Sequence, residues 1–185
     1  EKGIVVFNTP GANANAVKEL TILALLMSSR KVVDSILWSK SLSGIPEDIK
    51  VLIEKEKGRF VGPEIKGKKL GVIGLGAIGV MVANAAGSLG MEVKGYDPYI
   101  SIDSAWGLSR SVKKAESLKE LLEGSDYITL HVPFMDSTRN MIDNKAFKLM
   151  KRGVRLLNFS REGLVDNAEL KKALNEGIVE TYATD

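Results

Sequence analysis

Three segments of this 185-residue chain combine residue types and spacings that suit the binding of a nucleotide and an organic acid. Gly74, Gly76 and Gly79 form a G-x-G-x-x-G sequence, which is typical of turns that hold phosphate groups. His131 is the only histidine, the residue type whose pKa best suits proton transfer near neutral pH. Arg161 can donate two parallel hydrogen bonds to a carboxylate. These residues predict phosphate binding, proton transfer and carboxylate recognition.

The strand before the glycine-rich segment and the helix after it indicate what the segment binds. Gly74 permits a tight turn, Gly76 lets a pyrophosphate approach the backbone, and Gly79 lets the next helix lie close to the sheet. The amides of a helix that starts at Ala77 would face the phosphates with the positive end of the helix dipole. Asp97, at the end of the next strand, can accept hydrogen bonds from adenosine ribose hydroxyls and would repel a 2′-phosphate, which favours NAD over NADP. Alternatively, the glycines only shape a turn, and Asp97 is a solvated strand cap.

The two later segments allow more than one interpretation. His131 precedes Val132 and Pro133, and Pro133 ends the strand so that backbone groups face a bound cofactor. His131 could act as a general base, but without a visible carboxylate partner a packing role at the strand end is favoured. Arg161 follows a buried strand, which suits a bidentate clamp on a carboxylate. Its alternative is a surface ion pair with Glu162 or Asp166.

Alternating strands and helices must position these residues. The pattern predicts βαβ units, and therefore an α/β fold with a Rossmann-type, doubly wound parallel sheet in a three-layer αβα arrangement. A helix over residues 13–38 is apolar around much of its circumference, so part of it should be buried against a second partner. Strands are predicted at 4–7, 70–73, 92–96, 127–130, 154–157 and 179–184, and helices at 13–38, 47–57, 77–89, 117–122, 144–150 and 167–174.

Composition excludes several other classes of protein. With 44% hydrophobic residues, the chain can bury a core, and no linker divides it, so one domain over residues 1–185 is predicted. A net charge of +3 is too small and too scattered to indicate nucleic acid. The apolar stretch 20–27 is too short to span a membrane. The absence of cysteine excludes a disulfide framework and a thiolate metal site and fits a cytoplasmic protein; no metal site is predicted.

The order of the motifs resembles one known family along nearly the whole chain. The sequence is similar to the nucleotide-binding domain of the D-isomer-specific 2-hydroxyacid dehydrogenases, whose N-x-A-R-G-x-x-V-D motif corresponds to residues 158–166. The motifs that carry the resemblance, in order, are Asn8-Thr9-Pro10, Gly67-Lys68-Lys69-Leu70-Gly71, the glycine-rich segment, Tyr96-Asp97-Pro98, Leu130-His131-Val132-Pro133, Thr138 and the segment from Asn158 to Asp166.

The resemblance implies a role for each matching position. Arg161 would bind the carboxylate and keto oxygen of the substrate, and Asp185 would contact the nicotinamide side of NAD. His131 would lie beside the cofactor rather than act as the acid–base histidine. The remaining positions that the resemblance places along the cofactor are Ala77, Ile78, Asp97, Val132, Pro133, Thr138, Phe159 and Ser160. Three residues depart from the family pattern, namely Ala77 for an arginine, Glu162 for a glycine and Asn167 for a glutamate.

The family resemblance also implies an activity. It predicts reversible hydride transfer between NAD and C2 of a D-2-hydroxy acid, with the identity of the acid left open. The family's supporting glutamate and acid–base histidine would lie beyond Asp185, so the chain is expected to be the cofactor domain of a longer enzyme. The alternative is a module that senses NAD(H) without catalysis. Family members dimerise through this domain, so we expect a homodimer with the 13–38 helix and the loop that follows it in its interface.

Overall fold

The computed structural model describes residues 3, 9, 11–44 and 48–185. Its strands, in chain order, are β1 (Lys69–Ile73), β2 (Glu92–Tyr96), β3 (Lys113–Lys114), β4 (Tyr127–Leu130), β5 (Val154–Asn158) and β6 (Val179–Thr184). Its α-helices are α1 (Ala14–Ser29), α2 (Val32–Ser41), α3 (Ile49–Glu56), α4 (Ala77–Ser88), α5 (Ile102–Gly107), α6 (Leu118–Gly124), α7 (Asn144–Leu149) and α8 (Asn167–Asn175). Two short 3-10 helices are η1 (Lys57–Phe60) and η2 (Glu162–Leu164).

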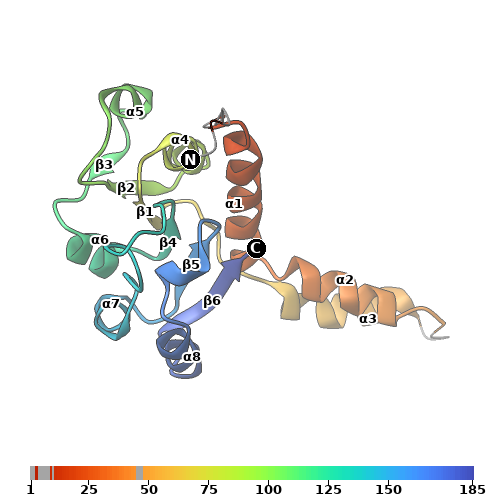
Figure 1. Ribbon diagram of the computed structural model, residues 1–185. Coiled ribbons are helices and arrows are strands. Elements are labelled where there is room, and N and C mark those ends of the chain that lie inside the picture. Colours follow the sequence, from red (N-terminus) through yellow and green to blue (C-terminus); the bar gives the residue numbers. More distant parts are fainter. Residues whose placement is uncertain (1–2, 4–8, 10, 45–47) are drawn as a thin grey trace.

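The strands form one sheet in the order β3-β2-β1-β4-β5-β6, and every neighbouring pair is parallel (Figure 1). The central strand β4 is buried along its whole length, as expected for three apolar residues and the β-branched Thr129. Helices α1 and α4 cover one face of the sheet, and α6, α7 and α8 cover the other. The predicted doubly wound, three-layer α/β fold is therefore confirmed.

Two apolar clusters hold the three layers together. Leu25 of α1 and Val82 of α4 belong to the cluster on one face, together with Val72 of β1. Leu121 of α6 and Phe147 of α7 belong to the cluster on the other face, and all five side chains are at most 3% exposed. The sheet is buried from both sides, as the strand sequences require.

The predicted helix over residues 13–38 is wrong in its extent, because the chain breaks between α1 and α2. Arg30 has extended backbone angles, φ −116° and ψ 127°. The carbonyl oxygen of Ser28 accepts a hydrogen bond from Arg155 Nε at 2.8 Å, so it is engaged where a continuous helix would pair it with the Val32 amide. That amide instead donates to Arg30 O at 2.7 Å. A contact from β5 therefore ends the helix.

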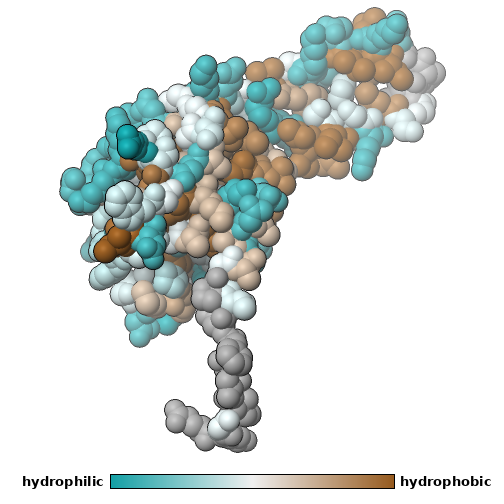
Figure 2. Space-filling model, turned by 90° about the horizontal axis from the view of Figure 1, so that it is seen from above, coloured by the Kyte–Doolittle hydropathy of each residue, from teal (hydrophilic) through white to brown (hydrophobic). Residues whose placement is uncertain are grey.

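The helices α2 and α3 form an arm that extends away from the sheet (Figure 1). Rings of Trp38 and Phe60, 5.2 Å apart between centroids, join α2 to η1 at the base of α3. The arm has no fully buried residue in α2 or α3. Figure 2 shows apolar residues gathered along it, and the exposed apolar side chains of α2 are Val32, Val33, Ile36 and Leu37.

Several other predictions can be compared with the elements that form. The bounds predicted for β2, β4 and β6 agree with the structure, and the other helices and strands from residue 47 onward agree within a few residues. The strand predicted at 4–7 lies outside the described residues. Among the α-helices and strands, two elements were missed, α5 and the two-residue strand β3, which lie in a stretch without clear periodicity. Among the described residues, no helix is both long and apolar enough to cross a membrane.

Candidate cofactor and substrate site

The carboxyl ends of five parallel strands meet along one edge of the sheet. Ile73 of β1 lies opposite Tyr96 of β2 and Leu130 of β4, Leu130 lies opposite Asn158 of β5, and Asn158 lies opposite Thr184 of β6. The residues that follow these ends are therefore neighbours at that edge. They are the residues predicted from the sequence, namely Gly74, Asp97, His131, Phe159, Ser160, Arg161 and Asp185. Open α/β sheets bind ligands at such an edge.

The glycine-rich turn needs glycine at two positions for steric reasons. Gly74 has φ +91°, and a Cβ there would lie 2.5 Å from the His131 carbonyl oxygen. A Cβ on Gly79 would lie 2.0 Å from the Gly74 carbonyl oxygen, so the start of α4 can pack against the turn only with glycine there. These close contacts do not by themselves indicate a ligand. They set the path of the backbone from β1 into α4.

Gly76 differs from these two glycines because nothing requires it for packing. It is exposed, its φ is −74°, and a Cβ at this position would meet no atom within 4 Å. It is also the N-cap of α4, and no side chain caps the first amides of this 12-residue helix. An open cradle in front of uncapped helix amides fits a phosphate group. The residues present therefore fit the pyrophosphate of a dinucleotide.

The Asp97 carboxylate is fixed by two backbone amides. Oδ2 accepts a hydrogen bond from the Leu75 amide at 2.8 Å, and Oδ1 accepts one from the Tyr99 amide at 2.8 Å. The first bond ties the end of β2 to the glycine-rich turn. Because each carboxylate oxygen has a further lone pair, the half-buried Asp97 can still accept hydrogen bonds from two hydroxyl groups.

A cavity of about 480 Å³ lies beside Asp97. Its apolar wall includes the buried Leu75 and the half-buried Ile100, Leu108 and Val112. None of these four residues was predicted as part of a site. Leu75 lies within the glycine-rich segment, and the only signal for the other three was their position after Asp97, because their approach to Leu75 depends on the loop that carries α5.

The loop after β4 is closed by Thr138. Its hydroxyl donates a hydrogen bond to Pro133 O at 2.7 Å and accepts one from the Met135 amide at 2.8 Å. Val132 is half-buried and packs against the core, whereas Pro133 is exposed. Thr138 therefore holds the loop in shape, and the edge of the crevice is formed largely by backbone.

Arg161 lies in a loop held by hydrogen bonds at the end of β5. Asn158 Nδ2 donates to Arg161 O at 2.9 Å, and Ser160 Oγ donates to Leu130 O at 2.8 Å. Thr184 Oγ1 donates to Asn158 O at 2.9 Å, which links β6 to the same loop. The Arg161 side chain is exposed and donates to the Ser160 carbonyl oxygen at 2.7 Å. The loop is thus joined to both neighbouring strands.

The ion pairs considered for Arg161 do not form. Glu162 Oε1 accepts a hydrogen bond from Asn167 Nδ2 at 2.9 Å. Asp166 Oδ1 caps α8 by accepting bonds from the amides of Ala168 at 2.9 Å and Glu169 at 3.1 Å. Within the described part of the chain, Arg161 takes part in no ion pair.

His131 lies beneath the glycine-rich turn and is packed rather than exposed to the crevice. Its Nε2 and Thr129 Oγ1 are 2.9 Å apart, while Nδ1 is buried and has no partner among the described residues. Burial lowers the pKa of His131 from its ordinary value of 6.5 to about 4. The imidazole is therefore neutral at neutral pH, and the geometry favours the packing interpretation of this residue.

This burial makes the stability of the fold sensitive to acid. Below pH 6.5 the unfolded chain binds a proton at His131 that the folded chain does not bind until about pH 4. Stability therefore falls as the pH falls through this window, by about 2 kcal/mol between pH 7 and pH 4.5. Urea unfolding at both pH values should show that His131→Gln removes this part of the loss. Equal losses in the two proteins would contradict the buried neutral state.

The other predicted site residues differ in whether their side chains are exposed or buried. The Phe159 side chain is 8% exposed and belongs to the apolar cluster with α1 and α4, so only its backbone faces the strand ends. Ala77 is exposed at the start of α4, and Ile78 is half-buried. Asp185 is exposed and directly follows β6. The predicted residues that directly follow the strand ends thus lie at one edge, but the Phe159 ring and the His131 imidazole are packed into the fold.

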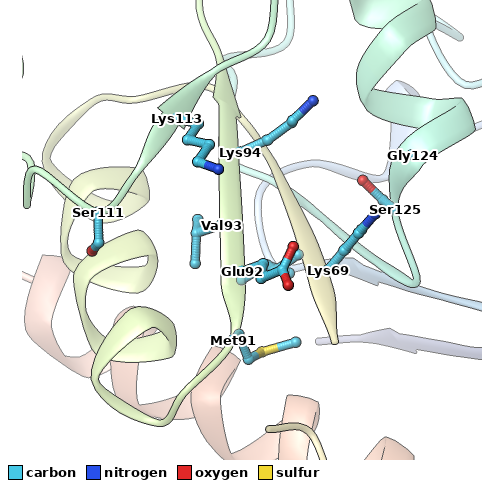
Figure 3. A pocket seen from close by; sticks show the side chains of 10 residues that line it. Lys69, Met91, Glu92, Val93, Lys94, Ser111, Lys113, Gly124 and Ser125 are labelled. Atoms are coloured by element: carbon cyan, nitrogen blue, oxygen red, sulfur yellow. The ribbon is translucent and has the colours of Figure 1, made fainter. Parts of the chain in front are cut away.

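A separate cavity of about 450 Å³ lies near the amino-terminal ends of β1 and β2 (Figure 3). Lys69, Lys94 and Lys113 line it, together with the buried Val93. Lys94 Nζ donates to Glu120 of α6 at 2.6 Å, and this hydrogen bond lowers the pKa of the Glu120 carboxyl. No predicted site residue lines this cavity, which lies at the end of the strands opposite the glycine-rich turn.

The parallel sheet, the glycine-rich turn and the acidic residue at the end of β2 define a dinucleotide-binding α/β domain. Residues 23–185 match the family model described as "D-isomer specific 2-hydroxyacid dehydrogenase, NAD binding domain". The chain belongs to this family, and it is an NAD-binding domain. The family resemblance drawn from the sequence and the choice of NAD as cofactor are confirmed.

Individual relatives agree with this family. The chain is 38% identical to the D-3-phosphoglycerate dehydrogenase of Methanocaldococcus jannaschii, covering 100% of this chain and 33% of that protein. It is 35% identical to that of Sus scrofa, with 95% and 30% covered. A D-lactate dehydrogenase from Aquifex aeolicus, solved with NAD and lactic acid, has TM-score 0.81 and 30% identity, with 100% and 51% covered. The chain spans about a third of the length of the curated relatives it matches.

Proposed function

We propose that this chain serves an enzyme that transfers a hydride reversibly between NAD and C2 of a D-2-hydroxy acid. The observation that carries this proposal is the common edge at which the glycine-rich turn, Asp97 and Arg161 meet. When bound, NAD supplies the nicotinamide ring that accepts or donates the hydride. A cofactor site and a cationic side chain that forms no ion pair among the described residues then lie at the same edge of the sheet.

The residues at this edge have distinct roles in cofactor binding. The uncapped amides of α4 and the open space at Gly76 receive the pyrophosphate, and Asp97 accepts hydrogen bonds from the adenosine ribose hydroxyls. The apolar cavity beside Asp97 takes the adenine ring. Backbone and side chains at Pro133, Ser160 and Asp185 line the path toward the nicotinamide, with Ala77, Ile78, Val132, Thr138 and Phe159 supporting it.

Arg161 orients the substrate by holding its carboxylate and polarises the keto oxygen of the 2-keto acid. A guanidinium group suits this role because it is always charged and presents donors in one plane. His131 is neutral and buried, so the proton exchanged with the substrate oxygen requires a different group.

We infer that the acid is 3-phosphoglycerate, oxidised to 3-phosphohydroxypyruvate in serine biosynthesis in the cytoplasm. The inference is supported by the curated relatives, which are named D-3-phosphoglycerate dehydrogenases. The test is NADH-dependent reduction of 3-phosphohydroxypyruvate, hydroxypyruvate and pyruvate by the full-length protein, with the highest kcat/KM expected for the first. Preference for pyruvate would favour a lactate dehydrogenase, as in the A. aeolicus relative. No turnover with any acid would favour an NAD(H)-sensing module.

Asp97 should decide the choice between NADH and NADPH. In the wild-type chain its carboxylate would face the 2′-phosphate of NADPH, and like charges at close range cost about 1 kcal/mol or more despite screening. We therefore expect Asp97→Ala to weaken NADH binding and to reduce the difference in affinity between NADH and NADPH. Fluorescence titration of both cofactors measures this. Asp97→Asn is the control for the loss of the hydrogen bonds to the Leu75 and Tyr99 amides, because asparagine keeps one acceptor oxygen but no charge.

We also propose that the protein is a homodimer whose interface includes α1 and the arm. Four apolar side chains of α2 are between 47% and 60% exposed, and a face of this kind is typical of a protein–protein interface. Ile36→Lys should therefore shift the molar mass measured by light scattering from dimer to monomer. Ser41→Lys, at an exposed polar position about 140° around the same helix from Ile36, should leave the dimer intact. A wild-type chain that is monomeric at high concentration would contradict the interface.

A further inference from the structure

Arg161 has two acidic neighbours in the sequence, and both are engaged elsewhere. An exposed guanidinium with a carboxylate on the next residue would ordinarily attract it, because opposite charges a few ångströms apart stabilise each other even in water. Such an ion pair would compete with any substrate carboxylate for the same donors. The side chains of Glu162 and Asp166 therefore determine whether Arg161 is available.

Asp166 is held firmly by the backbone of α8. Its Oδ1 accepts bonds from two amides of the first turn, at Ala168 and Glu169, and N-caps of this kind stabilise a helix. Turning Asp166 toward Arg161 would break both bonds. Its carboxylate is thus kept in place by the fold itself.

Glu162 has no such backbone partner and depends on one side chain. Its Oε1 accepts a hydrogen bond from Asn167 Nδ2 at 2.9 Å, from the first residue of α8. The backbone around it is well fixed. The Asn140 amide donates to Gly163 O at 2.8 Å, and a Cβ on Gly163 would lie 2.4 Å from the Phe134 ring, so the loop packs against that ring. Only the rotation of the Glu162 side chain remains to be controlled.

We propose that Asn167 is a positioning residue that holds the Glu162 carboxylate away from Arg161 and so leaves the guanidinium available for the carboxylate of a 2-keto acid. This proposal rests on the proposed function of Arg161. An amide suits the task because it donates to the carboxylate without adding a charge of its own near an anionic substrate. An acid at position 167 would repel Glu162 and turn it toward Arg161.

The full-length protein tests this proposal through kinetics. We expect Asn167→Ala to raise KM for the 2-keto acid about three- to fivefold, the range that an exposed ion pair can supply. The value of kcat and the affinity for NADH should change little, because neither depends on this carboxylate. Asn167→Asp, which has nearly the same shape but repels Glu162, should raise KM at least as much. Asn175→Ala, at an exposed position of the same helix, is the matched control.

A second substitution distinguishes this mechanism from a general disturbance of α8. Glu162→Gln should restore KM in the Asn167→Ala background, because the amide cannot form an ion pair with Arg161. In this chain itself, the Nε–Hε resonance of Arg161 should shift in Asn167→Ala and return toward its wild-type position in the double variant. A rise in KM that persists in the double variant would overturn the proposal.

The proposal and the proposed function can fail separately. If Arg161→Ala impairs the enzyme and Asn167→Ala and Asn167→Asp both leave KM unchanged, Arg161 binds the substrate but Asn167 does not position Glu162. If Arg161→Ala itself leaves KM and kcat unchanged, the role of Arg161 is wrong and the role of Asn167 falls with it.

Discussion

Replacing Gly76 with alanine should leave the fold intact and weaken NADH binding by about tenfold or more. A Cβ at this position meets no atom of the described residues within 4 Å, and φ −74° is a conformation that alanine adopts readily. The methyl group would, however, occupy the space through which the pyrophosphate approaches the α4 amides. Losing one hydrogen bond to a charged group costs about 1.5–3 kcal/mol, which corresponds to at least a tenfold change in affinity.

Two further glycines provide the controls for this experiment. Gly124→Ala, at the end of α6 and also without close neighbours, should change neither NADH affinity nor stability substantially. Gly79→Ala should instead lower the free energy of unfolding, because its Cβ would lie 2.0 Å from the Gly74 carbonyl oxygen. Isothermal titration with NADH and urea unfolding separate the two effects. If Gly76→Ala binds NADH as tightly as the wild type, the turn does not hold the pyrophosphate.

Replacing Arg161 with alanine should lower kcat/KM of the full-length protein by at least about a hundredfold. Two charge-assisted hydrogen bonds to the substrate carboxylate and keto oxygen would be lost, and each is worth about 1.5–3 kcal/mol. The measured change in kcat/KM reports this loss of transition-state stabilisation directly. The affinity for NADH should stay within about twofold of the wild-type value, because the proposed pyrophosphate and ribose contacts lie at the ends of β1 and β2 rather than at Arg161.

Two other arginine variants test whether the effect is specific. Arg161→Lys keeps the positive charge but loses the planar fork, so it should recover only part of the activity. Arg110→Ala, at an exposed position, should behave as wild type. Wild-type kinetics of Arg161→Ala would remove this residue from the substrate site, whatever the outcome for NADH.

Much of the fold followed from local sequence patterns. Strand β4 is a short run of apolar and β-branched residues, and β2 alternates buried and more exposed residues before a turn, so their predicted bounds agree with the structure. The dinucleotide turn was predictable because its glycines and Asp97 lie within one βαβ unit, where spacing along the chain determines spacing in the fold. Arg161 could be placed at the same edge because parallel strands end together.

Contacts between distant residues explain what could not be predicted. The end of α1 depends on Arg155, which is 127 residues from the Ser28 carbonyl that it contacts. The strand β3 has two lysines and no apolar pattern, so only its partner β2 reveals it. The pairing of Glu162 with Asn167 depends on the directions of two exposed side chains at the start of α8. Local patterns contain no information about such directions.

The central claim is that the carboxyl edge of this sheet binds NAD through the glycine-rich turn and Asp97. Its most direct test is a fluorescence titration of NADH and NADPH into the chain as it stands, at physiological salt. We predict saturable binding of one NADH per chain, with NADPH at least about fivefold weaker, as a penalty of about 1 kcal/mol requires. Equal affinity for the two cofactors, or no saturation with NADH, would contradict the claim.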